Sequence, residues 1–320
     1  MAGEITVLKW LRERQFNKKT VAALLGILLV SSLPLFRGYL PSTEGAAVFR
    51  DLLLDRRPGS DPAVTGLLIL WGIQILTLVL SYCSFEKMPL AGTLLYMLCP
   101  YRLYIAYDKM DPAKLLVWAF LPLSISLLFR KRAEGEKTAG RWIRVGIGFG
   151  ILPMSWRLLS VTAAAAEEPF WGGGYAFGQF FTLFAYLEDH PGMGLGILLG
   201  TAYLLYECIA EDRKVSGAGK GFAFAGLVLM ILSLRRFPWY VLIRVVPGLG
   251  VLLAPLGTAG SFAGLSAAVL CFSASSGMAE VYEKEEKYRK TALFVLVIAL
   301  ALLQGIFMQN EYLYFQYPLE

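Results

Sequence analysis

The sequence has little of what soluble catalytic sites are usually built from. Its 320 residues include a single histidine, His190, and only 17% are charged, whereas soluble domains carry about a quarter. One histidine excludes any site that needs two imidazole ligands. The four cysteines stand singly within or beside apolar runs, and no C-x-x-C spacing occurs, so neither a zinc site nor a redox pair is predicted. These cysteines are Cys83, Cys99, Cys208 and Cys271.

Apolar residues are what the sequence has in abundance. They make up 57% of the chain, and the mean hydropathy is +0.57. They gather in repeated runs of roughly 16 to 22, long enough to cross a bilayer as helices. Backbone groups in lipid must bond internally, so these runs predict helices rather than strands. We therefore expect an all-α, polytopic integral membrane protein with about nine transmembrane helices (eight to ten).

The expected organisation is a basic amphipathic segment (1–19), one transmembrane domain (20–308) and an outer tail (309–320). An aromatic segment at 175–190 predicts a helix in the membrane interface, and residues 235–248 are expected to dip into the bilayer from outside. The span count depends on residues 221–278, where one span can be gained or lost. The expected spans cover residues 20–36, 64–83, 89–107, 113–129, 145–163, 193–209, 221–234, 256–278 and 291–308.

Charge placement orients the spans. With the N-terminus in the cytoplasm, 19 of the 30 Lys and Arg residues fall in cytoplasmic segments, nine fall outside and two lie within spans, as the positive-inside rule expects. The net charge of +6 is thus a topology signal, and nucleic acid is not an expected partner. The expected location is a multi-pass position in the cytoplasmic membrane.

Two arginines lie within predicted spans, Arg102 and Arg157. Arg102 follows Pro100 in a tyrosine-rich span, where proline predicts a break near residues 96–100. An arginine at the bilayer centre costs about 2.5–3.5 kcal/mol on insertion scales. One interpretation is that each snorkels to the interface or pairs with a carboxylate. The other is that both line an outer cavity and bind a substrate phosphate, which suits the planar guanidinium.

Carboxylates in the predicted outer loops are the catalytic candidates. Asp51, Asp55 and Asp61 lie in the first loop, and Asp108 and Asp111 in the second. Glycosyl transfer needs a general base for the acceptor hydroxyl, and carboxylates can also hold a divalent cation near a phosphate. The alternative is that these acids are solvated loop charges. His190, at the outer mouth of a span, is either an interface residue or an accessory group.

Three stretches resemble bacterial YfhO-like membrane proteins of the glycosyltransferase C superfamily. They are residues 94–132, which contain PYRLY and LPL, residues 177–200, and residues 235–248, which contain FPW. The resemblance implies transfer of a sugar from a polyprenyl-phosphate donor to a cell-envelope acceptor on the outer side. It places catalysis on a first-loop acid (Asp51, Asp55 or Asp61) and puts Tyr101 and Arg102 in the matching motif. It also implies a bacterial inner membrane and membrane-protein partners.

Two other classes of function remain open. One is a transporter or flippase for a lipid-linked or anionic substrate, although no internal repeat is evident. The other is a non-catalytic scaffold descended from such an enzyme. A common outer cavity holding Arg102 and one first-loop acid would favour the enzyme.

Overall fold

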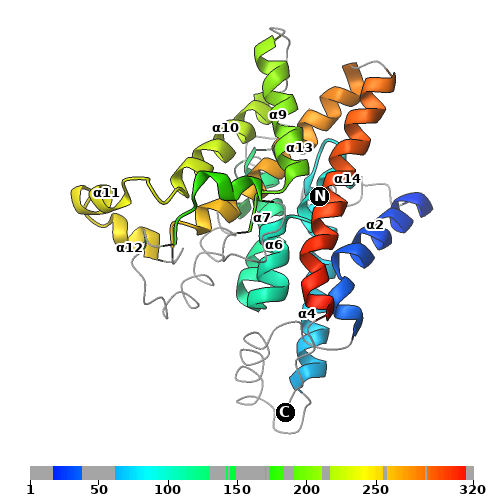
Figure 1. Ribbon diagram of the computed structural model, residues 1–320, viewed down its shortest axis with the longest axis horizontal. Helices are drawn as coiled ribbons and strands as arrows, with labels where there is room; N and C mark the ends of the chain where they lie inside the picture. Colours follow the sequence, from blue (N-terminus) through cyan, green and yellow to red (C-terminus); the bar gives the residue numbers. More distant parts are fainter. Residues whose placement is uncertain are drawn as a thin grey trace, which may run out of the picture.

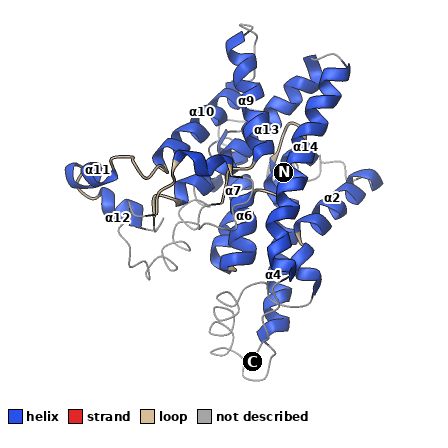
Figure 2. Cartoon of the chain, viewed as in Figure 1, coloured by secondary structure: helices blue, strands red, loops and turns tan. Residues whose placement is uncertain are grey.

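The chain folds into a bundle of helices. A computed structural model describes residues 17–37, 62–129, 142, 145–148, 170, 173–182, 191–210, 217–254, 258–284 and 287–314. Within these residues every regular element is a helix (Figure 1, Figure 2). Strand pairing there is limited to an isolated bridge between Tyr175 and Leu234. The all-α prediction is confirmed for this part of the chain.

The first half of the bundle consists of long apolar helices around one broken helix. Residues 89–109, expected as a single span, form three short pieces. The elements are α2 (Lys18–Ser31), the 3-10 helix η1 (Leu33–Arg37), α4 (Pro62–Ser84), α5 (Pro89–Met97), α6 (Pro100–Tyr104), the π-helix η2 (Ile105–Lys109) and α7 (Pro112–Phe129).

The second half follows the expected order of spans, with ends that differ by a few residues. Of the helix expected at 175–190, the described part forms only a 3-10 helix, η3 (Phe177–Phe181). The span expected at 145–163 lies mostly outside the described residues. The remaining elements are α9 (Leu195–Ala210), α10 (Gly217–Leu232), α11 (Trp239–Val245), α12 (Leu249–Leu253), α13 (Ser261–Lys284) and α14 (Lys287–Tyr314).

Three helices are long and apolar enough to cross a membrane, judged by length and composition. These stretches are Thr65–Ser84, Ser261–Glu283 and Tyr288–Asn310. Shorter apolar helices cover Lys114–Phe129, Leu195–Ile209 and Gly217–Leu232. The described part of the chain therefore has the helices of a membrane protein, and about nine spans remains a prediction.

Helix α13 packs closely against α9 and α10 through small residues. A Cβ placed on Gly200 of α9 would lie 2.9 Å from the Cβ of Ala274, closer than two carbon atoms normally approach. On the other side, Ser266 Oγ donates to the carbonyl of Gly226 in α10 at 2.7 Å. The small residues of the sequence around 256–278 thus serve close helix packing, as predicted.

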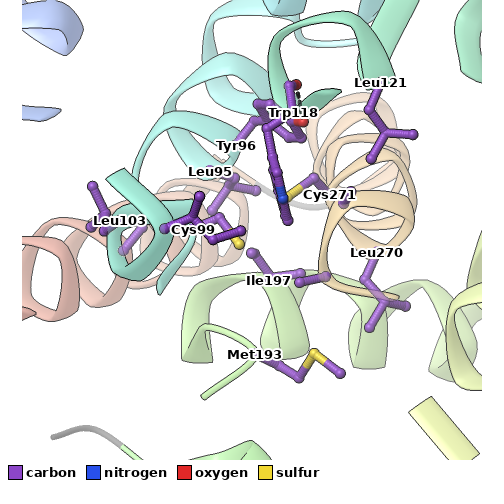
Figure 3. Packing of buried hydrophobic residues seen from close by; sticks show 14 of the residues in the cluster. Leu95, Tyr96, Cys99, Leu103, Trp118, Leu121, Met193, Ile197, Leu270 and Cys271 are labelled. Carbon is purple, nitrogen blue, oxygen red and sulfur yellow. Dashed lines mark hydrogen bonds between the residues drawn. The ribbon is translucent and has the colours of Figure 1, made fainter. Parts of the chain in front are cut away.

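The core lies where α5, α6, α7, α9 and α13 meet. Figure 3 shows Tyr96 beside Trp118, with Cys99 and Cys271 nearby. Tyr96 and Trp118 rings lie 5.5 Å apart, and the Tyr96 hydroxyl donates to the carbonyl of Trp118 at 2.6 Å. Cys83, Cys99 and Cys271 are buried free thiols, and Cys208 is half-buried. They are packing residues.

Contacts at the two ends of the bundle agree with the predicted alternation of helix direction. At the predicted cytoplasmic end, Lys87 Nζ lies 3.3 Å from Glu280 Oε1, although the two residues are far apart in sequence. At the predicted outer end, Gln304 of α14 accepts from the backbone N–H of Leu195 at 2.8 Å. Gln309 likewise donates to the carbonyl of Val30 at 2.9 Å. Each contact joins segments that the charge pattern places on one side.

Candidate functional site

The site is built around the break between α5 and α6. Pro100 has no N–H and occupies the first turn of α6, and Cys99 before it is extended (φ −57°, ψ 123°), as a residue preceding proline usually is. The helix stops at Met97 and restarts at Pro100. The predicted break near residues 96–100 is confirmed, and its cause is the proline.

Arg102 sits inside this break, wholly buried at 0% exposure. Its Nη1 donates to the carbonyl of Met97 at 2.7 Å, which satisfies a backbone group that the interruption leaves free. Its Nη2 donates to Oε1 of Gln74 in α4. Nε is buried and has no hydrogen-bond partner among the described residues. Neither contact is with a carboxylate, so Arg102 is held by neutral oxygen acceptors.

The bond to Gln74 begins a chain of polar contacts that ends on α2. Gln74 Nε2 donates to the hydroxyl of Tyr107 at 3.3 Å, and that hydroxyl donates to the carbonyl of Ser31. Ser31 is the last residue of α2, where the helix dipole places partial negative charge. The chain therefore connects the guanidinium through two neutral side chains to an electronegative helix end.

This chain joins four segments that are distant in sequence: α2, α4, the α5–α6 break and η2. Gln74 and Tyr107 are as buried as Arg102. The π-helix η2 carries Tyr107, and Met110 just after it adopts a left-handed conformation at φ 46°. Isolated π-helical turns occur frequently at functional sites. Together the break, the π-helix and the buried cation distinguish this segment from a plain membrane anchor.

Tyr101 points away from the polar chain and into aromatic packing. Its ring stacks on Trp118, with centroids 5.7 Å apart and planes at 26°. A Cβ on Gly264 of α13 would overlap the Tyr101 ring, so only glycine allows this close approach. Tyr101, predicted as an accessory group, therefore fixes α6 against α7 and α13.

The two described acids of the second predicted loop pair with neighbouring lysines. Asp108 Oδ2 lies 3.3 Å from Lys109 Nζ, and both side chains are more than a third exposed. Asp111 lies 3.5 Å from Lys114 Nζ and accepts from the Lys114 backbone N–H at 3.0 Å. That second contact caps the start of α7. These contacts give Asp111 a structural role in the described fold.

The remaining predicted site residues lie outside the described residues. They are Asp51, Asp55, Asp61, Arg157 and His190. The expectation that a first-loop acid shares an outer cavity with Arg102 stays a prediction. Conversely, sequence reasoning missed Gln74 and Tyr107, which hold Arg102. A glutamine amid the apolar residues of 64–83 was the signal that could have identified the first of them.

Two hollows among the described residues lie toward the predicted cytoplasmic end, away from Arg102. One, of about 390 Å³, is lined by Tyr203, Glu207 and Arg289, among others. The other, of about 130 Å³, lies beside Lys87 and Ser126. Within the described part of the chain, no three His, Cys, Asp or Glu side chains gather into a group that could hold a metal ion.

Comparisons with models of known protein families, with curated proteins and with solved structures found no match.

Proposed function

We propose that this chain is a multi-pass protein of the bacterial inner membrane that transfers a sugar from a polyprenyl-phosphate donor on the outer side. The observation that carries the proposal is the fully buried Arg102 in the broken helix α5–α6. Ionisable residues within membrane helices are costly, and they commonly mark substrate or ion sites. The likeness of residues 94–132 to glycosyltransferase C proteins supplies the class of reaction.

The membrane arrangement rests on three helices long enough to cross, three shorter apolar helices and the spans expected from sequence. These give about nine crossings with a cytoplasmic N-terminus. The contacts between Lys87 and Glu280 and between Gln304 and Leu195 support the alternation of directions. Partners are then the bilayer, the lipid-linked donor and other membrane proteins of the envelope.

In the proposed reaction Arg102 exchanges its bond to the neutral amide of Gln74 for one to the donor phosphate. Charge-assisted bonds to phosphate are shorter and stronger than bonds to a neutral amide. One of Asp51, Asp55 and Asp61 accepts the proton of the acceptor hydroxyl. The hydroxyl oxygen bonds to the sugar C1 as the C1–O bond to phosphate breaks, and polyprenyl phosphate leaves with that electron pair. Arg102 offsets the negative charge that develops on the leaving phosphate.

A second candidate, a non-catalytic scaffold, is favoured by one observation. Arg102 is fully enclosed, and both its Nη atoms bond to protein oxygens. A residue that only joins α4 to the α5–α6 break needs no substrate. The two functions differ in what happens when donor is supplied.

The test is sugar transfer by purified protein in liposomes that contain a polyprenyl-phosphate sugar. We expect turnover by the wild type and losses of at least about 100-fold for Asp55→Ala and Arg102→Ala, as for the removal of a group that contacts the reacting atoms. Asp51→Ala and Asp61→Ala are assayed in parallel to identify the base. Lys109→Ala, which removes an exposed outer charge, is the control. Unchanged turnover in all of the acid and Arg102 variants rules out the proposed site, and absence of transfer by the wild type favours the scaffold.

A further inference from the structure

A short helical hairpin projects from the bundle after α10. We call residues 235–254, which contain α11 and α12, the outer arm (Figure 1). Its base is firmly attached. The Trp239 indole N–H donates to the carbonyl of Leu232 at 2.7 Å, and the ring stacks on Phe262 with centroids 5.4 Å apart. The Arg235 N–H donates to the carbonyl of Tyr175 at 2.8 Å. The arm therefore holds a defined position.

The face of the arm away from the bundle is apolar and uncovered in the described structure. Trp239 and Leu253 pack inward, whereas Val245, Val251 and Leu252 are 70%, 80% and 66% exposed. A helix that is apolar on both sides is expected in an apolar surrounding rather than in water. Contiguous exposed apolar surface of this kind marks a membrane or protein contact.

The same arm carries a concentrated positive charge. Arg235, Arg236 and Arg244 are exposed, and the sequence contains no acidic residue between Asp212 and Glu280. Arg244 lies over the ring of Tyr240, 4.2 Å from its centroid. None of the three arginines forms an ion pair with another described residue.

This contrasts with the other described basic residues of the predicted outer side. Lys109 and Lys114 pair with Asp108 and Asp111, so their charges are neutralised locally. The arm's arginines also run against the positive-inside rule, which predicts few basic residues in short outer segments. Their charge therefore calls for an external anionic partner.

We propose that the outer arm is a lipid-binding surface in the headgroup region of the outer leaflet, specific for anionic phospholipid. Val245, Val251 and Leu252 lie among the acyl chains, and the three arginines bind phosphates of phosphatidylglycerol-type lipids. An apolar face rimmed by arginine is typical of interfacial helices, and guanidinium binds phosphate with two parallel bonds. A symmetric contact between two copies would bring arginines against arginines, so a lipid surface is the better fit. This inference is independent of the reaction proposed above.

The first test measures lipid selectivity by native mass spectrometry in neutral detergent with equal amounts of phosphatidylglycerol and phosphatidylcholine. We expect the wild type to prefer phosphatidylglycerol about fivefold for each of up to three bound lipids, and less at high salt. Replacing Arg235, Arg236 and Arg244 together by Gln should abolish the preference, and replacing them by Lys should retain most of it. The control Lys109→Gln/Lys114→Gln should keep it. The proposal is overturned if the triple Gln variant keeps the full preference or if the control loses as much.

The second test leaves all three arginines in place, so it stands even if the triple variant does not fold. A fluorophore is attached to Val251→Cys in a Cys208→Ser background, since the other three cysteines are buried. In nanodiscs we expect its emission to be quenched by a doxyl group near the lipid headgroup and to be protected from aqueous iodide. Quenching by iodide alone would place the arm in water. Protection from both quenchers would mean that protein covers this face, and either result contradicts the proposal.

Discussion

Arg102 donates a hydrogen bond to the carbonyl of Met97 across the break between α5 and α6, with Nη1 and O at 2.7 Å. The proline that interrupts the helix frees a backbone acceptor, and the arginine of the same short motif satisfies it. One buried cation thus compensates for the break and connects it to α4 through Gln74.

This relationship predicts strong coupling between Arg102 and Gln74. Arg102→Met should lower the free energy of unfolding by about 2–4 kcal/mol, because buried acceptors lose their donor. Gln74→Leu alone should cost a similar amount, since it leaves the buried cation without an acceptor. The double variant should cost less than the sum of the two. Urea or thermal unfolding in detergent measures all four proteins, and strictly additive costs would contradict the coupling.

Close packing of α9 on α13 predicts that Gly200→Ala is destabilising. The new methyl would lie 2.9 Å from the Cβ of Ala274, so the helices must separate, at a cost of about 1–3 kcal/mol. Gly72→Ala is the matched control, because nothing lies within 4 Å of its Cβ position. There the gain in helix propensity should stabilise the protein by about 0.5–1 kcal/mol. Melting temperatures that shift in the same direction for both variants would contradict this packing.

The ion pair at the predicted cytoplasmic end predicts an asymmetry between its two partners. Glu280 is 3% exposed and Lys87 is 38% exposed. Lys87→Met removes the countercharge of a buried carboxylate, whereas Glu280→Gln removes the buried charge itself. We expect the first to lower the melting temperature more, with a difference of at least about 1 kcal/mol in unfolding free energy. Equal effects, or a larger effect of Glu280→Gln, would show that the carboxylate does not depend on Lys87.

Tyr175, in the segment outside the spans, predicts a pH dependence. Burial raises the pKa of its hydroxyl well above the ordinary value of 10.0, and the hydroxyl donates to the carbonyl of Pro191 at 3.1 Å. The folded state therefore retains a proton that the unfolded chain releases above pH 10. Stability from this group is constant below that pH and falls as pH rises beyond it, by up to about 1.4 kcal/mol per pH unit. Tyr175→Phe should reduce that alkaline slope in pH-dependent melting, and an unchanged slope would contradict the assignment.

Local chemistry explains which features the sequence could predict. The break at Pro100 follows from a missing N–H, and the packing of α13 follows from its small residues. Both effects act within one or two helices, so composition and spacing reveal them. The order and approximate ends of the apolar helices follow for the same reason.

The partners of Arg102 could not be predicted, because they depend on how distant helices meet. Gln74 comes from α4, and the chain of bonds ends on α2. Arg102 was expected to reach the interface, a carboxylate or a phosphate, and its acceptors in the described structure are an amide and a backbone carbonyl. The π-helix at Ile105–Lys109 also depends on tertiary contacts, such as those of Tyr107.

The most direct test of the central claim, that Arg102 serves sugar transfer and not only the fold, uses the double variant Arg102→Met/Gln74→Leu. Its turnover with a polyprenyl-phosphate sugar in liposomes is compared with that of the wild type at a temperature where both remain folded. The account predicts a loss of at least about 100-fold in turnover. Wild-type turnover by the folded double variant would contradict it and leave Arg102 a purely structural residue.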